Sequence, residues 1–219
     1  MRGESKKERQ APLAANHPPH PPAGARDKDQ INLADEESRI MKVSGGGFEQ
    51  CYNGPIAVDM ESLLIVKTGT CQAGNARQQV EPMLKPFHGL PVELGALTTW
   101  VTDAGYYSEA NVNACGKHPI TPLIAVSREA HHGDSLERFT GPPPLAQDAT
   151  PVERMRYALK TKAGLRIYAK RKCTVEPVIG IVKSVGFRQF PLRGLGNVKG
   201  ELNLVSLAWN LKRMFVLIG

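Results

Sequence analysis

The apolar segments of this chain are short, and the order in which they occur limits what the chain can fold into. Extended segments are predicted at residues 48–59, 63–70, 98–104 and 120–126. Helical segments are predicted at 75–87, 108–115, 152–162, a stretch leading to 171–172, a helix from 174, and 201–217. The order of these elements indicates an α/β fold with a mixed sheet and flanking helices: a hairpin, a helix, a strand, a helix, a strand and then several helices. No apolar run reaches the roughly 18 residues needed to span a membrane, so no membrane segment is expected.

The two ends of the chain differ from its middle in composition. Residues 1–30 are polar and rich in proline, which fixes φ and removes a backbone donor, so a disordered tail is expected there and the folded domain at 31–219. Gly45-Gly46-Gly47 is predicted to be a flexible joint, and residues 186–200 are predicted to form a glycine-rich loop. In the last helix we expect an inward-facing stripe made of Leu204, Leu207, Ala208, Leu211 and Phe215.

The cellular compartment of the protein is inferred from its N-terminal residues and its cysteines. The first residues lack the apolar stretch of a signal peptide, and the four cysteines lie far apart without a CxxC pair. This pattern favours a reducing, cytoplasmic location over a disulfide-stapled secreted fold.

Positive charge is concentrated in the last third of the chain. The net charge is +7, but residues 151–219 hold 14 Lys and Arg against 3 Asp and Glu. A basic segment on a near-neutral body is typical of nucleic-acid contact, and the plain alternative is a solvated helical face.

Two acidic residues stand out as candidates for chemistry. Asp103 ends an apolar strand, at the edge where open α/β sheets place their sites, although it could equally cap the following turn. Glu176 interrupts an apolar helical series and shares a helix face with Gly180 and Lys183, although it could equally be a solvent-facing ion-pair partner. Two carboxylates from distant parts of the chain suit a divalent-metal site, which normally needs a third carboxylate.

Several segments together resemble the DDE transposases of bacterial insertion sequences. Asp103-Ala104-Gly105-Tyr106 and the stretch from Thr174 to Lys183 look like that family's second and third acidic motifs. The segments 186–190, 192–195 and 207–214 match its C-terminal tail, and 28–33, 36–41 and 44–50 are also similar. The resemblance covers roughly residues 27–215.

The resemblance implies a ribonuclease-H-like catalytic core that cuts and joins DNA strands. Asp103 and Glu176 would be catalytic residues and ligands of Mg²⁺ or Mn²⁺. Tyr168, Arg171 or Lys172, Glu176 and Lys183 resemble the family's Tyr-Arg-Glu-Lys signature, and Arg188 adds to the DNA-binding set. The implied partner is double-stranded DNA at the element ends, with a homo-oligomer left open and no small-molecule substrate.

The departures from the family concern the first acidic motif. No Asp-Gly-Thr occurs, and Asp59, the obvious substitute, is followed by one strand and then a helix instead of two strands. We therefore expect a partial catalytic domain that lacks its first strand, leaves one sheet position vacant and does not cleave DNA alone. We also expect Asp103 and Glu176 to converge. The alternative is a non-enzymatic remnant that binds DNA or transposase subunits through its basic C-terminal third.

Overall fold

The structure is a computed structural model that describes residues 32–43, 46–74, 77–87, 90–91, 93, 95–127 and 141–219. The predicted tail at 1–30 lies outside these residues. Three pairs of strands are formed: β1 (Arg39–Lys42) with β2 (Phe48–Cys51), β3 (Ile56–Val58) with β4 (Ile65–Thr68), and β5 (Thr99–Thr102) with β6 (Thr121–Ile124). The first two pairs are antiparallel and the third is parallel.

Helices separate the strand pairs and make up the C-terminal part of the chain. Between β4 and β6 lie η1 (Arg77–Gln79), α1 (Val80–Leu84), η2 (Lys85–Phe87), η4 (Ala104–Tyr106) and α2 (Glu109–Gly116). After β6 come α3 (Pro151–Lys160), α4 (Lys162–Ala169), η5 (Lys170–Cys173), α5 (Val175–Ser184) and α6 (Leu195–Ile218). None of the helices in the described ranges is long and apolar enough to cross a membrane.

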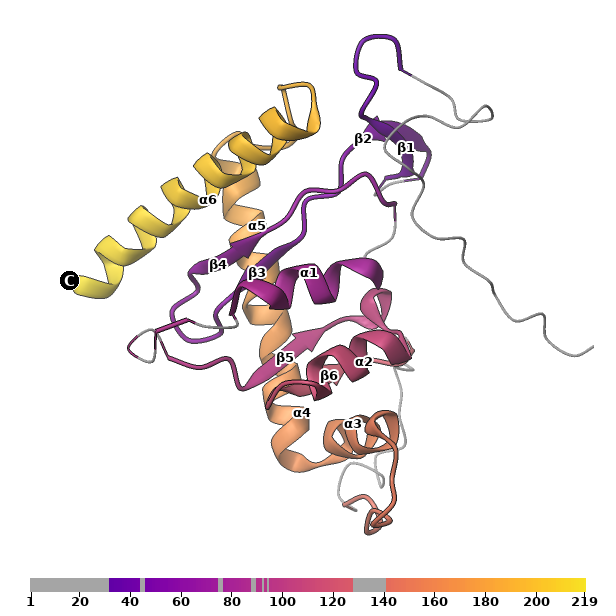
Figure 1. The fold of residues 1–219 in the computed structure, drawn as a ribbon. Coiled ribbons are helices and arrows are strands. Elements are labelled where there is room, and N and C mark those ends of the chain that lie inside the picture. The colour runs from indigo at the N-terminus through magenta and orange to yellow at the C-terminus, as the bar shows by residue number, and fades with distance from the viewer. Residues whose placement is uncertain are drawn as a thin grey trace, which may run out of the picture.

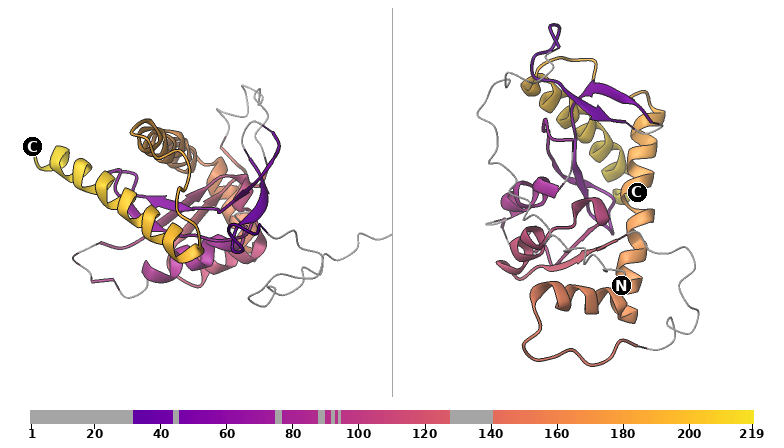
Figure 2. Two further views of the ribbon diagram at one scale, coloured as in Figure 1. Left: turned by 90° about the horizontal axis from the view of Figure 1, so that it is seen from above. Right: turned by 90° about the vertical axis from the view of Figure 1, so that its right-hand side faces the viewer.

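The strands of the second and third pairs lie between two layers of helix. Helices α1 and α2 cover one face, and α5 runs along the other face behind both pairs (Figure 1; Figure 2, right). From top to bottom in Figure 1 the strands follow the order β4, β3, β5, β6. β3 and β5 run in opposite directions in the same view, and no hydrogen-bonded pairing joins them.

One hydrophobic core joins β3 and β5 although their backbones are not paired. Trp100 of β5 packs in a cluster with α1 and α2, and Ala57 of β3 packs against that same cluster. Phe87 meets Trp100 edge to face, with ring centroids 6.4 Å apart. The buried members of the cluster are Val80, Met83, Leu84, Trp100, Cys115 and Ile120. A second, smaller cluster of Val112, Ile124 and Met155 attaches α3 to α2 and β6.

Helix α6 closes the outer edge of β4 with side-chain hydrogen bonds. The Asn210 side chain accepts from the Ile65 N–H at 2.8 Å and donates to the Ile65 carbonyl at 2.8 Å. The Trp209 indole N–H donates to the Leu63 carbonyl, and the Arg213 Nε donates to the Ser62 carbonyl. A backbone edge that would otherwise be free to pair is thus satisfied by one helix.

The N-terminus of α6 is held by two carboxylates from the segment before β1. The Leu195 N–H donates to Glu37 at 2.8 Å, and the Gly194 N–H donates to Asp35 at 3.3 Å. Negative charge at this position complements the helix dipole and satisfies amides that have no partner inside the helix.

The structure corrects two predictions. The expected loop at 186–200 is wrong from residue 195 onward, because α6 begins there on the two carboxylates and includes Gly196 and Gly200. The expected inward stripe is also wrong: Leu204, Leu207, Ala208, Leu211 and Phe215 are exposed, and α6 buries Val198, Leu202 and Ser206 instead. Of the predicted joint at Gly45-Gly46-Gly47, the first glycine lies outside the described residues, and Gly46 and Gly47 precede β2 with φ of 88° and 112°.

The predicted mixed sheet is confirmed only in part. All four predicted extended regions contain strands, and both antiparallel and parallel pairings occur. The region 48–59 is split into β2 and β3 around Asn53-Gly54-Pro55, however, and the pairing divides into three two-stranded sheets. The molecule is therefore mixed α/β, with a discontinuity between β3 and β5.

Candidate functional site

A bent series of helices, α3 to α5, carries most of the predicted site residues. Thr150 and Glu153 form a capping box that starts α3, and Pro151 occupies the first helical position, where its missing N–H costs nothing. Thr161 then ends α3 and caps α4 through the Gly164 N–H at 3.0 Å. Only glycine fits at 164, because a Cβ there would overlap the Ala158 carbonyl. The sharp α3–α4 turn therefore sets the direction of α4, which carries Tyr168.

Tyr168, Arg171 and Glu176 are brought together where η5 joins α4 to α5. The Arg171 guanidinium lies over the Tyr168 ring, 5.6 Å from its centroid, and one of its terminal nitrogens lies 3.9 Å from a Glu176 carboxylate oxygen. The sequence left Arg171 and Lys172 as alternatives for the basic position of the signature. In the structure it is Arg171 that contacts both other residues.

The Arg171 side chain has spare hydrogen-bonding capacity. Its Nε is buried and has no partner among the described residues, which is unusual for a buried guanidinium nitrogen. Its ion-pair partner Glu176 is 62% exposed, so the pair is screened by water and contributes little to stability. The guanidinium is therefore held in place by an aromatic ring, and its terminal nitrogens, rather than the buried Nε, are the donors that an anionic ligand can reach.

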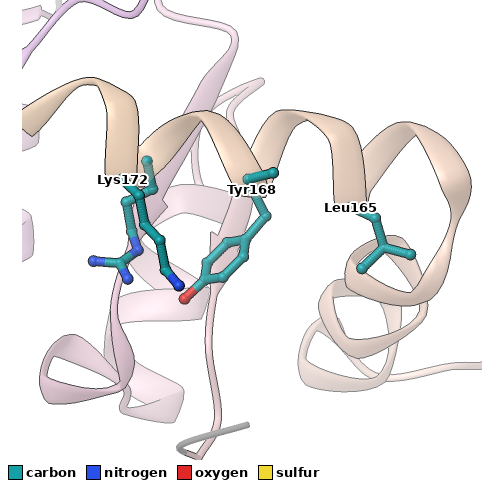
Figure 3. A pocket seen from close by; sticks show the side chains of 5 residues that line it. Leu165, Tyr168 and Lys172 are labelled. Atoms are coloured by element: carbon teal, nitrogen blue, oxygen red, sulfur yellow. The ribbon is translucent and has the colours of Figure 1, made fainter. Parts of the chain in front are cut away.

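A shallow pocket of about 210 Å³ lies beside this cluster, on α4 and η5. It is lined by Leu165, Tyr168, Ala169, Arg171 and Lys172. Tyr168 and Lys172 point the same way from the helix, with the lysine ammonium beside the phenol ring, and Leu165 lies one turn away (Figure 3). Sequence reasoning did not pick out Leu165 and Ala169, although Leu165 lies three residues before Tyr168 and Ala169 three before Lys172, which places each pair on one helix face.

The remaining basic candidates lie farther along the chain. Lys183 is exposed in the last turn of α5, and Arg188 is exposed in the loop that follows. Gly180, between Glu176 and Lys183, is exposed, and a Cβ at this position would have no neighbour within 4 Å. The helix face that carries Glu176 and Lys183 is therefore open, as the sequence predicts.

Asp103 lies directly after β5, as predicted, and its carboxylate caps the next turn. It accepts a hydrogen bond from the Gly105 N–H at 2.9 Å and starts η4. No contact with Glu176 is recorded for the described part of the chain, so their convergence stays a prediction. Capping of the following turn was one of the two interpretations that the sequence left open, and it is the role that Asp103 has in the structure.

Asp59 is fully engaged in its own turn between β3 and β4. Its carboxylate accepts from the Ser62 hydroxyl at 2.7 Å and from the N–H groups of Ser62 and Glu61. Partial burial raises the pKa of Asp59, but these hydrogen bonds outweigh it, so the net pKa lies below the ordinary 3.8. The turn also lies at the end of the β3–β4 pair opposite to the carboxyl end of β5 (Figure 1). Asp59 is thus poorly placed to replace a missing acid beside Asp103.

The described residues do not complete a metal site. Nowhere in the described ranges do three or more His, Cys, Asp or Glu side chains gather so that they could hold a metal ion. A hard cation such as Mg²⁺ prefers several oxygen ligands, and here one carboxylate caps a turn while the other is paired with arginine. The two predicted ligands alone therefore do not fit a two-metal centre.

One comparison with known proteins identifies part of the chain. Residues 145–215 match the family model of the transposase DDE domain, a stretch that runs from just before α3 into the last turns of α6. No curated protein and no solved structure matches the chain. The matched third of the chain contains the Tyr168–Arg171–Glu176 cluster and supports a transposase-type function.

Proposed function

We propose that the chain is an incomplete transposase catalytic domain of the ribonuclease-H-like kind, which binds DNA but does not cleave it alone. The family match over residues 145–215 carries this proposal, because it falls on the basic, helical part of the molecule. Cleavage and strand transfer by a DDE site would need Mg²⁺ or Mn²⁺ held by Asp103, Glu176 and a third acid. The described residues supply no such set of three.

The residues around η5 are suited to hold DNA phosphates. Arg171 is oriented by the Tyr168 ring and by Glu176. Lys172 shares the pocket on the same helix, and Lys183 and Arg188 are exposed farther on. Oriented arginines give geometric precision to phosphate contacts, and lysines add charge that tolerates different DNA positions.

The proposal is tested by titrating labelled duplex DNA with the protein at several salt concentrations. If Arg166, Lys170, Arg171, Lys172, Lys183 and Arg188 each neutralise one phosphate, the log–log salt slope is about −5. Replacing Lys172 and Lys183 together with glutamine reduces the slope by about 2, since each phosphate contact contributes about 0.9.

Lys42→Gln is the matched control, because Lys42 is exposed on the distant β1–β2 hairpin. It leaves the slope unchanged. Affinity that does not vary with salt, or a slope that Lys42→Gln and the double variant lower equally, contradicts the proposed DNA surface.

A further inference from the structure

The β3–β4 and β5–β6 pairs each have an outer edge and an inner edge. The outer edge of β4 is satisfied by Asn210 of α6. On the outer side of β6, Pro122 has no N–H to offer an added strand, which is typical of an edge strand. The inner edges of β3 and β5 have no backbone partner within the described residues.

The free groups on β3 are identified by its alternation with β4. The Asp59 N–H donates to Leu64 and the Pro55 carbonyl accepts from Gly69, so odd-numbered residues of this segment bond toward β4. In an antiparallel pair the residues between them point the other way. The backbone groups of Ile56 and Val58 therefore lie on the open edge.

The same reasoning applies to β5. The Thr98 carbonyl accepts from Thr121, and the Thr102 carbonyl accepts from Ala125, so even-numbered residues bond toward β6. The backbone groups of Thr99 and Val101 therefore lie on the open edge of β5.

The two open edges belong to one core and lie next to each other. Ala57 of β3 and Trp100 of β5 pack on one hydrophobic cluster, and β3 and β5 are neighbours in the strand order of Figure 1. β5 also carries two buried side-chain atoms, the Trp100 indole nitrogen and the Thr102 hydroxyl, that have no partner among the described residues.

We propose that the position between β3 and β5 is a binding site for one extended, apolar segment of a second polypeptide. An added strand there would pair with Ile56 and Val58 on one side and with Thr99 and Val101 on the other, which requires about five extended residues. Since β3 and β5 run in opposite directions, the added strand is antiparallel to one and parallel to the other.

The layers on either side determine the chemistry of the added segment. Helices α1 and α2 lie on one face of this position and α5 on the other (Figure 2, right). A strand covered on both faces is apolar throughout rather than alternating, and rich in Val and Ile. This inference goes beyond DNA binding, because it concerns a protein partner and a different part of the molecule.

Amide hydrogen exchange of the full chain, read residue by residue by NMR, tests the proposal. In the free protein we expect the amides of Ile56, Val58, Thr99 and Val101 to exchange at least tenfold faster than those of Ala57 and Thr102, which are bonded inside the pairs. The probe is a nine-residue peptide of five alternating valines and isoleucines flanked by two lysines at each end. The control peptide has proline in place of the central residue, because proline cannot donate within a sheet.

The apolar peptide slows exchange of the four edge amides, and the proline peptide does not. The proposal is overturned if these amides are already protected in the free protein at all protein concentrations, or if they become protected as the protein concentration rises, which would make a second copy the occupant. It is also overturned if the apolar peptide protects only other residues, or none. Each result is independent of the DNA titration, so the two proposals can fail separately.

Discussion

The outer edge of β4 and the inner edge of β3 belong to the same two-stranded ladder, yet the fold treats them in opposite ways. At the outer edge, Asn210 bonds both backbone groups of Ile65, and Trp209 and Arg213 extend the cover to the adjoining turn. At the inner edge the described chain provides nothing, although Ala57 is packed in the core. The difference is that α6 satisfies the outer edge of β4, whereas the inner edge of β3 has no backbone partner among the described residues.

A matched pair of proline substitutions on β5 gives the largest expected contrast. Thr102→Pro removes an N–H that bonds toward β6 and leaves the buried Leu123 carbonyl without a partner, which costs about 2 kcal/mol or more. Thr99→Pro removes an N–H on the open edge at the first residue of the strand, where proline is tolerated. Urea unfolding measures both.

Thr102→Pro must destabilise the protein more than Thr99→Pro if the inner edge of β5 is open. Equal destabilisation by the two prolines would mean that the Thr99 N–H is also bonded, and that the inner edge of β5 is closed.

Removing the cover of the outer edge has the next largest effect. Asn210→Ala breaks two hydrogen bonds to Ile65 and lowers the free energy of unfolding by about 2 kcal/mol, at about 1 kcal/mol for each bond. Asn203→Ala is the control on the same helix, because Asn203 makes one exposed contact with Thr68. We expect it to cost less than about 0.5 kcal/mol by the same urea measurement. If the order is reversed, α6 does not hold β4 through Asn210.

The smallest expected effect is the pH dependence contributed by the β3–β4 turn. The folded pKa of Asp59 lies below its ordinary value of 3.8, so its contribution is complete above that pH and is lost as the pH falls through the folded pKa. Asp59→Asn therefore flattens the acid side of the stability curve below about pH 4 and leaves the curve near pH 7 parallel to wild type. An unchanged acid limb would show that the turn hydrogen bonds are not made in solution.

The sequence predicts the local elements well and the tertiary relations less well. Ser108 and Pro151 mark the starts of α2 and α3 because caps and proline act within one turn of chain. The start of α6 could not be placed in the same way, because it depends on Asp35 and Glu37, which lie about 160 residues earlier. The exposed side of α6 was misjudged for a related reason: its surface is set by β4 and by side chains such as Asn210, which an apolar periodicity does not detect.

The candidate site shows the same division between local and distant relations. The members of the Tyr168–Arg171–Glu176 cluster were named by the resemblance, which left Arg171 and Lys172 as alternatives, and they lie within nine residues on adjoining helical turns. The relation between Asp103 and Glu176 depends on how β5 and α5 are placed across a layer boundary, which spacing cannot supply.

The most direct test of the account is a nicking assay with supercoiled plasmid and the purified chain in Mg²⁺ or Mn²⁺. Wild type is compared with Glu176→Ala and with Glu81→Ala, a matched control on the exposed side of α1. We expect no cleavage by any of the three, because the described residues supply no group of three acids to hold two metals about the reacting oxygens. Cleavage by wild type and Glu81→Ala that is lost in Glu176→Ala would contradict it, since the site would then be complete in this chain.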